Sequence, residues 1–416
     1  MRIGIIGGGS AGLTAAWLLQ DDHEVTIIER QNRLGGHAHT VEAKHEDATT
    51  LVDSGFEFFI EDVYPGFSRL LDALKVPRRS FPMTLTLYFE DSGAVHMVPP
   101  KRPDGFFWPA FAPRSLSYLL QFAYFLRSGA RMVESPHRSM TIGDFVAHCR
   151  LSRRFRDEFL YPFMIGGWCI PIEEFRRMSA YCVLKYIELH RPRGLAPRIF
   201  SEIPGGTAAY VAALRNALSR VFVQTGAEVR RIRRTGGGFA VEHAGGGQLE
   251  FDHLVFATNA AEASSLLERV EGAEAVRAVL GQFRYFQTWI AVHGDRRLMP
   301  RDTGQWSVFN IRWCKYRSMS TVWKQQRTAL PVFKSWVDRD APPPEPLYHF
   351  TRYHHPFVDA PHFEAQQRLA ALQGRQNLWF AGAYTDDIDC HENAVQSAIR
   401  LVRQLAPASR NLARLV

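Results

Sequence analysis

Residues near the start of the chain have the types and spacing needed to bind a nucleotide diphosphate. A complete G-x-G-x-x-G pattern includes Gly7, Gly9, Ser10, Ala11 and Gly12. In this pattern the first glycine permits a tight turn, the second lets the backbone approach a pyrophosphate, and the third lets a helix pack closely on a strand. Glu29 follows at the spacing where a carboxylate binds a ribose hydroxyl. These residues predict dinucleotide binding.

The residues around this pattern predict the elements that would position it. Residues 2–6 are a short apolar, β-branched run, typical of a buried strand, and residues 13–19 predict a helix. Residues 23–28 predict a second strand that ends at Glu29. Free N–H groups at the start of the helix would face the phosphates. The glycines and the immediate second strand argue against a secretory signal.

Length and composition indicate a two-domain globular enzyme. The chain has 416 residues, which exceeds the size at which a single core usually keeps growing. Its hydrophobic content of 46% and charged content of 22% are ordinary. The five cysteines are scattered, with no C-x-x-C pair, so neither disulfides nor a metal site is indicated, and a reducing cytoplasm is expected.

The net charge of +8 leaves room for an acidic partner. Nucleic acid is a poor candidate, because no binding module accompanies the basic runs, and a single basic run is more commonly a solvated face. Residues 106–126 are apolar and aromatic but are interrupted by two prolines, an arginine and a glutamine, so they are too broken to span a membrane. Three interpretations stay open: contact with the inner membrane surface, the roof of an apolar pocket, or an internal helix.

The choice between NAD and FAD depends on the residues after Glu29. Residues 30–37 resemble the R-x-G-G-R segment of the flavin amine oxidases, phytoene desaturases and protoporphyrinogen oxidases, and this resemblance implies FAD. In that superfamily the segment wraps the pyrophosphate and lies under the flavin. Arg33 matches the first arginine, and His37 replaces the second, which weakens the phosphate contact or passes it to the backbone. The cofactor-binding residues that we predict here are Arg30, Arg33, Gly36, His37, Gly55 and Phe56.

The end of the chain carries a second part of the resemblance. In the superfamily the last strand ends in G-D or G-E, whose acid holds the ribityl chain, and the last helix opens with E-G-A-x-x-S-G. Gly382 matches the strand glycine, but Ala383 replaces the acid. The helix opening matches at Glu392 and Ala394, with Asn393 in place of the glycine. Backbone N–H groups at the start of this helix would stabilise negative charge on a reduced flavin.

The middle of the chain resembles the superfamily less specifically. Residues 203–207 look like the turn by which the chain re-enters the cofactor domain. The runs 221–223, 226–229, 239–241 and 253–258 predict strands of a small sheet over the adenine, with Val229 as the adenine contact, although a plain β-meander explains the pattern equally well. Four stretches, residues 64–67, 161–171, 353–356 and 382–393, look like a subgroup of predicted bacterial NAD/FAD-binding flavoproteins related to amine oxidases. That subgroup implies lipid-like or other apolar substrates.

We therefore predict an α/β fold with a Rossmann-like FAD-binding domain of the glutathione-reductase type and an interleaved α+β substrate domain. The FAD domain would comprise residues 1–62, 200–262 and 375–416, and the substrate domain residues 63–199 and 263–374. The expected enzyme is an oxidase, dehydrogenase or desaturase that transfers hydride from a C–H bond of an apolar, lipid-like or amine molecule to flavin N5. Oxygen or a quinone would then reoxidise the flavin.

Several alternatives stay open at this stage. A redox-neutral isomerase of an unsaturated apolar substrate would use the same cofactor, and a non-catalytic scaffold would have lost it. His37 and His39 could tether flavin covalently, although the resemblance marks neither position for such a link. No sequence pattern identifies a catalytic base. Lys315 and Lys324 are candidates for a lysine near flavin N5, but both are more typical of a surface.

Overall fold

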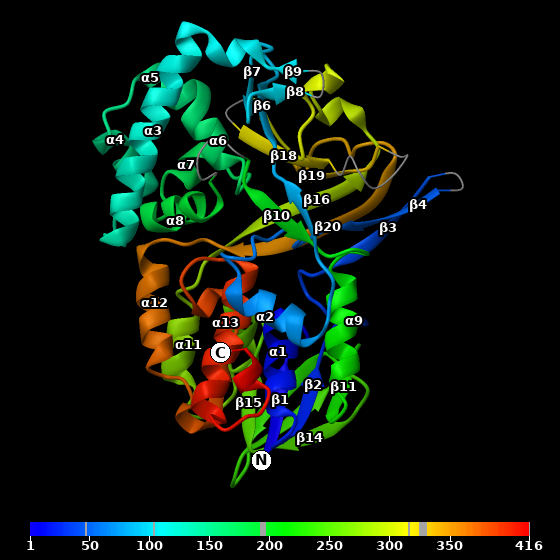
Figure 1. Cartoon of the computed structure of the whole chain (residues 1–416). Helices are drawn as coiled ribbons and strands as arrows, with labels where there is room; N and C mark the ends of the chain where they lie inside the picture. The colour runs from blue at the N-terminus through cyan, green and yellow to red at the C-terminus, as the bar shows by residue number, and fades with distance from the viewer. Residues whose placement is uncertain (46–47, 103–104, 192–196, 315–316, 324–330, 416) are drawn as a thin grey trace.

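Two large β-sheets, one in each half of the molecule, organise the chain (Figure 1). The computed structural model describes residues 1–415 except 46–47, 103–104, 192–196, 315–316 and 324–330. Both ends of the chain lie in the half that holds the parallel sheet. The predicted α/β class, with a parallel sheet and a second, mixed sheet, is confirmed.

The first half is built on a five-stranded parallel sheet. Its strand order is β11 (Val221–Gln224), β2 (Glu24–Ile28), β1 (Arg2–Ile6), β15 (His253–Phe256) and β21 (Leu378–Phe380). Side chains alternate between the two faces of a strand, so Ile3 and Ile5 belong to one core and Ile6 to another. The central strand β1 is thus covered on both faces, as is usual for a parallel sheet.

One face of this sheet is covered by helices. They are α1 (Ser10–Leu19), α2 (Pro65–Ala73), α9 (Ala208–Ala217) and α13 (His391–Leu405). The predicted helix after the glycine pattern is α1, which is buried along its whole length and packs against α13 and α9. The predicted opening of the last helix coincides with the start of α13 at His391.

The other face carries a small antiparallel sheet and three helices. These elements are β12 (Val229–Arg234), β13 (Phe239–His243), β14 (Gln248–Phe251), α10 (Ala260–Leu266), α11 (Glu274–Leu280) and α12 (Ala360–Ala370). The prediction of a single small sheet was wrong for residues 221–223 and 253–258, because these form β11 and β15 of the parallel sheet. In β15, consecutive residues are buried on opposite faces, which is typical of an inner parallel strand. Helices α11 and α12 pack in this core although they fall within the segment predicted for the substrate domain.

The second half is built on a seven-stranded mixed sheet. Its strand order is β20 (Leu347–Pro356), β16 (Tyr285–His293), β19 (Phe333–Val337), β18 (Arg317–Trp323), β17 (Phe309–Cys314), β6 (Leu85–Phe89) and β7 (Val95–Val98). Helices share a core with the β6–β17 side of this sheet. They are α3 (Pro113–Glu134), α4 (Ile142–His148), α5 (Arg153–Phe155), α6 (Tyr161–Ile165), α7 (Ile172–Phe175) and α8 (Ala180–His190).

Short elements complete the chain. The paired strands are β3 (Thr40–His45) with β4 (Ala48–Asp53), β5 (Arg79–Pro82) with β10 (Ile199–Glu202), and β8 (Lys101–Arg102) with β9 (Gly105–Phe106). The helical turns are η1 (Trp108–Phe111), η2 (Arg156–Leu160), η3 (Arg296–Leu298), η4 (Thr303–Gln305), η5 (Arg375–Asn377), η6 (Ala383–Thr385) and η7 (Leu412–Arg414). Among the described residues, no helix combines the length and hydropathy that crossing a membrane requires.

The packing of α1 on β1 predicts a steep penalty for one methyl group. A Cβ atom added to Gly12 would lie 2.0 Å from the carbonyl oxygen of Gly7, far inside the ordinary contact distance of about 3.5 Å. We expect Gly12→Ala to lower the free energy of unfolding by about 1–3 kcal/mol, as overpacked cores do. Trp17 is buried in the same helix, so tryptophan fluorescence during urea unfolding reports the change.

The matched control is Gly237→Ala. Gly237 is exposed, and an added Cβ atom would have no other atom within 4 Å. Equal unfolding midpoints for the two alanine variants would contradict this packing.

Candidate functional site

A cleft of about 1350 Å³ is lined by residues from both halves of the molecule. It reaches from the glycine turn after β1 to the strands β16, β19 and β20. Fifteen of the predicted cofactor-binding residues line it, namely Gly7, Gly9, Ser10, Ala11, Glu29, Arg30, Arg33, Gly36, His37, Gly55, Phe56, Val229, Gly382, Ala383 and Ala394. Gly12, Glu392 and Asn393 are not among the lining residues. Residues that are far apart in the sequence therefore meet in one cleft.

The glycine turn leaves open space on its cleft side. Gly7 has a φ of +107°, which favours glycine, and its N–H donates to the carbonyl of Ile28 at 2.9 Å. At Gly9, by contrast, the nearest atom to an added Cβ would be the Cα of Gly36, 4.0 Å away. Packing within the protein therefore does not require glycine at position 9.

Glu29, which follows β2, has a carboxylate that is held in place and can still accept further hydrogen bonds, as ribose binding would require. Its carboxylate oxygens accept hydrogen bonds from the backbone N–H groups of Gly8 and Gln31, both at 2.7 Å. These bonds orient Glu29, and a carboxylate retains further lone pairs for hydroxyl donors. Val229 lines the same cleft at the start of β12. Arg30 is already paired, since its Nη1 lies 3.0 Å from Oε1 of Glu262.

Arg33 offers an unneutralised positive charge to the cleft. Its Nη1 donates to the carbonyl of Gly36 at 3.0 Å, which fixes the side chain beside the backbone of residues 30–37. The resemblance predicts that this segment contacts the pyrophosphate. Within the described part of the chain no carboxylate forms an ion pair with it. A guanidinium held in this way is suited to a phosphate, because its planar donors match phosphate oxygens.

His37 presents a neutral ring where the resemblance expects an arginine. Its ring centroid lies 4.7 Å from that of Tyr353 and 5.6 Å from that of His355. His37 keeps an exposed surface in the cleft, but desolvation by the surrounding residues, and secondarily the neighbouring His355, lower its pKa from 6.5 to about 4. With His37 in place of the second arginine of the superfamily segment, the cleft therefore has one positive charge fewer.

Phe56 and His391 form the next part of the wall. Their rings are stacked, with centroids 3.8 Å apart and an interplanar angle of 3°. The Nε2 atom of His391 lies 3.1 Å from the hydroxyl of Ser10 and 3.2 Å from that of Tyr210. Burial lowers the pKa of His391 from 6.5 to about 3, so the ring is neutral. It links the first turns of α1 and α13.

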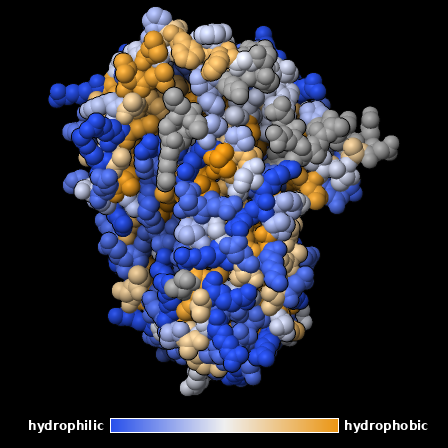
Figure 2. Space-filling model, viewed as in Figure 1, coloured by the Kyte–Doolittle hydropathy of each residue, from blue (hydrophilic) through white to orange (hydrophobic). Residues whose placement is uncertain are grey.

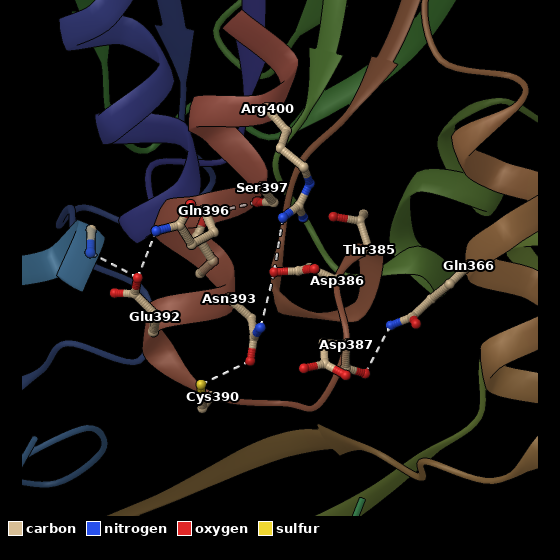
Figure 3. A network of polar contacts seen from close by, with 12 residues as sticks. Gln366, Thr385, Asp386, Asp387, Cys390, Glu392, Asn393, Gln396, Ser397 and Arg400 are labelled. Atoms are coloured by element: carbon tan, nitrogen blue, oxygen red, sulfur yellow. Dashed lines mark hydrogen bonds and ion pairs between the residues drawn. The ribbon is translucent and has the colours of Figure 1, made fainter. Parts of the chain in front are cut away.

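The side chains of Glu392 and Asn393, at the start of α13, bond to neighbouring segments of the protein (Figure 3) and are not among the residues that line the cleft. The Glu392 carboxylate accepts from the backbone N–H groups of Gly66 and Phe67, both at 2.8 Å, so it caps α2. Asn393 donates to Asp386 at 2.9 Å and accepts from the thiol of Cys390 at 2.8 Å. Asn393 thus ties the start of α13 to the segment that follows Ala383, and Glu392 ties it to α2.

One buried charge near the cleft has no local sequence signal. Lys334 lies in β19, with its Nζ 2.5 Å from Oε2 of Glu57 and donating to the carbonyl of Gly55 at 3.1 Å. Burial lowers the pKa of this lysine from 10.5 to about 8. Lys334 thereby ties the cleft residue Gly55 to the seven-stranded sheet. The earlier candidates Lys315 and Lys324 lie outside the described residues.

A histidine and an aspartate also meet at the cleft. The Nδ1 atom of His355 lies 3.4 Å from Oδ2 of Asp389, and both residues line the cleft. Their side chains keep exposed fractions of 35% and 24%, so the pair is accessible to a small molecule. Residues 353–356 carried the resemblance without a role, and Asp389 had no signal of its own. A carboxylate beside a histidine orients the ring for proton transfer.

A glycine turn, an acidic residue after β2 and a cleft lined from two sheets are features typical of flavoproteins. The chain belongs to the family of flavin containing amine oxidoreductases, whose model matches residues 10–288, more than half of the chain. This flavin-containing family implies FAD as the cofactor. The cleft fits that group, since Gly9 leaves room, Arg33 supplies charge and Glu29 supplies an acceptor.

Individual proteins with a similar sequence or structure match this chain either over a short segment or at low identity. An L-amino-acid oxidase from Siganus canaliculatus is 56% identical over 43 residues, which is 10% of this chain and only 8% of that protein. A CLA-producing fatty acid isomerase from P. acnes has a TM-score of 0.71 at 16% identity, covering 97% of this chain and 98% of that chain. Cyclohexylamine oxidase from Brevibacterium oxydans IH-35A has a TM-score of 0.68 at 16% identity, covering 97% and 99%. At these identities the two structures show the fold alone.

The open space at Gly9 predicts a variant that folds but loses its cofactor. A Cβ atom at position 9 would enter open space, so for Gly9→Val we expect an unchanged unfolding midpoint of the flavin-free protein and at least a tenfold weaker affinity for FAD, equivalent to about 1.4 kcal/mol. The measurement is the ratio of flavin to protein after dialysis. Gly237→Val is the control, since Gly237 lies in open, exposed backbone. A Gly9→Val protein that keeps its full flavin content would refute the predicted pyrophosphate contact.

The neutral His391 predicts acid sensitivity with a defined sign. Its folded-state pKa of about 3 lies below the ordinary 6.5, so between these values the unfolded chain binds a proton that the folded chain does not. Its contribution to stability is complete above pH 6.5 and is lost as the pH falls. His391→Gln should reduce the slope of unfolding free energy against pH by up to about 1.4 kcal/mol per pH unit.

Urea titrations between about pH 4 and pH 6 measure this slope. His137→Gln, at an exposed histidine, is the control and should leave the slope as it is. If His391→Gln and the native protein had the same slope, the ring would not be buried in its neutral form.

Proposed function

We propose that the protein is an FAD-dependent oxidoreductase that oxidises a C–H bond of an apolar, lipid-like or amine small molecule. The observation that carries this proposal is the single cleft that joins the glycine turn and Glu29 to a wall of neutral aromatic side chains. FAD, when bound, supplies the acceptor of the hydride, and oxygen or a quinone is the proposed final acceptor. Glu29, Arg33 and Gly9 would hold the nucleotide, and His37, Phe56 and His391 would surround the flavin end.

The aromatic wall supports an apolar substrate. Tyr64, Tyr186, Tyr285, Ile290 and Trp336 are among the residues that line the cleft. Burial raises the pKa of Tyr64 well above its usual range and that of Tyr186 to about 12, so these phenols stay uncharged. An uncharged, desolvated wall favours apolar groups over strongly hydrated ones.

A second pocket of about 390 Å³ adjoins the cleft. It shares Tyr285 and Trp336 with the cleft and is also lined by Cys169, Ile170 and Pro171. The predicted turn within residues 161–171 therefore borders this pocket and not the main cleft. Its lining also includes charged residues, so this pocket could accommodate the polar part of a substrate whose other part is apolar.

The pair of His355 and Asp389 supports a proton-accepting role in the reaction. Oxidation of a C–H bond next to a heteroatom releases a proton as well as a hydride. The imidazole of His355 can take that proton at Nε2, because Nδ1 faces the carboxylate of Asp389. This assignment fills the place of the catalytic base that sequence patterns left unassigned.

The redox-neutral alternative has one specific observation in its favour. The fatty acid isomerase with a TM-score of 0.71 has a similar fold over nearly its whole length. In this alternative the same cleft would move a double bond in an unsaturated chain with no net acceptor. The non-catalytic scaffold alternative is less well supported, because the room at Gly9 is retained and Arg33 forms an ion pair with no carboxylate among the described residues.

The experiment mixes the purified protein anaerobically with linoleic acid and, separately, with cyclohexylamine. Bleaching of the flavin absorbance followed by oxygen uptake on aeration supports the oxidoreductase. Conversion of linoleic acid without bleaching or oxygen uptake supports the isomerase instead. Absence of any turnover with these probes and with a wider panel of unsaturated lipids and amines would contradict the proposed chemistry. Cell fractionation tests the proposed cytoplasmic location and the proposed peripheral contact with the inner membrane face.

The proton-accepting role predicts the effect of one substitution. Glutamine at position 355 keeps a hydrogen-bonding group near Asp389 but cannot accept a proton, so His355→Gln should slow flavin bleaching by about 10²-fold or more. The flavin content should stay unchanged.

His354→Gln is the matched control. His354 lines the same cleft but pairs with no carboxylate in the described part of the chain. Equal bleaching rates for the two variants would exclude His355 as the proton acceptor.

A further inference from the structure

Large apolar side chains are concentrated on the outside of one region of the second half. Of the thirteen large hydrophobic residues that are exposed in the described part of the chain, seven lie between positions 106 and 124. We call them the apolar ridge: Phe106, Trp108, Phe111, Leu116, Leu119, Leu120 and Tyr124. Figure 2 shows hydrophobic side chains gathered at the end of the molecule that carries α3 in Figure 1. Trp108 and Leu120 are 74% and 75% exposed, so water covers most of their surface.

The fold does not require this apolar surface. Helix α3 already buries an inner stripe that contains Tyr118, Phe125 and Met132. Gly129 belongs to the same stripe and lets α3 approach Leu184 of α8, since an added Cβ would lie 2.9 Å from that side chain. A surface helix of a globular protein normally carries polar residues on its opposite face. The leucines of the outer face therefore serve something outside the chain.

The charges of α3 are mainly basic. The helix contains three arginines, Arg114, Arg127 and Arg131, and one carboxylate, Glu134, which is its last residue. Arg114 pairs with Glu158, whereas Arg127 and Arg131 are exposed and pair with no carboxylate in the described residues. Leu120, Tyr124, Arg127 and Arg131 are spaced four, three and four residues apart, so they follow one side of the helix. On this side of α3, the helical turns with exposed apolar residues are thus followed directly by turns with exposed arginines.

This combination selects one kind of partner. A helix with exposed aromatic and leucine side chains and mainly basic charge is typical of a segment that lies in the plane of a membrane interface. Anionic head groups attract arginines, and the amphipathic rings of Trp108 and Tyr124 suit the interface. A second copy of the chain would bring like-charged arginines together, which disfavours self-association.

We infer that η1 and α3 dock on the surface of an anionic phospholipid bilayer. The apolar ridge enters the boundary between head groups and acyl chains, and Arg127 and Arg131 contact the head groups. This inference deepens the membrane contact of the proposed function and is independent of the flavin chemistry. It would give an apolar substrate a direct source, because lipids and lipophilic molecules are concentrated in the bilayer.

The test is co-sedimentation of the full-length, flavin-loaded protein with vesicles. Vesicles of phosphatidylcholine mixed with phosphatidylglycerol are compared with vesicles of phosphatidylcholine alone. We expect binding to the anionic vesicles, with at least tenfold weaker binding for the double variant Leu119→Ser, Leu120→Ser. The double variant Arg127→Gln, Arg131→Gln should lose the preference for anionic vesicles and the salt dependence of binding.

The control is Phe222→Ser, since Phe222 is 57% exposed on β11 at the other end of the molecule. It should bind vesicles as the native protein does. The flavin spectrum of each variant verifies that it is folded, and loss of vesicle binding with unchanged turnover of a soluble substrate separates this inference from the proposed function. No binding of the native protein to anionic vesicles, or equal binding of the leucine variant, would overturn the inference. A native dimer that dissociates in the leucine variant would instead assign the ridge to a second copy.

Discussion

The close contact between the start of α1 and the turn after β1 is the constraint on which the cleft depends. Gly12 has no room for a Cβ atom against the carbonyl of Gly7, so the first turn of α1 is fixed directly beneath the turn. The same turn holds the next cleft segment, because Gly35 donates to the carbonyl of Gly8 at 2.8 Å. One local contact therefore sets the positions of the glycine turn, the Arg33 segment and the N–H groups that face the cleft.

A second property of the cleft is that charged groups and uncharged rings line it side by side. Glu29 and Arg33 are charged, and each is held by a backbone hydrogen bond. The rings of His37 and His391 are uncharged, and His391 contacts Ser10 of the glycine turn. In the proposed function, the charged groups would recognise the diphosphate and the uncharged rings would surround the flavin. The exposed ridge on α3 adds apolar character to the outer surface of the second half of the molecule.

The sequence predicted those parts whose signals are local. The strand, turn, helix and second strand around Gly7–Gly12 are specified by neighbouring residues, and the structure has them at those positions. The cap that Glu392 provides for α2, the pair of Lys334 with Glu57, and the pair of His355 with Asp389 join different elements, so no spacing along the chain reports them. The small sheet was predicted with two strands too many, because a short apolar run does not tell which sheet it will join. Apolar residues 106–126 left three interpretations open, since only the folded helix shows that Leu119 and Leu120 face outward.

The most direct measurement of the central claim, that the cleft holds FAD, is the mass of the native protein before and after denaturation. A native mass that exceeds the chain by one FAD, with intact FAD released when the chain unfolds, is the expected result. A chain that carries no flavin and cannot be reconstituted with FAD would contradict the claim. It would then leave the unpaired charge of Arg33 and the empty space beside Gly9 without a ligand.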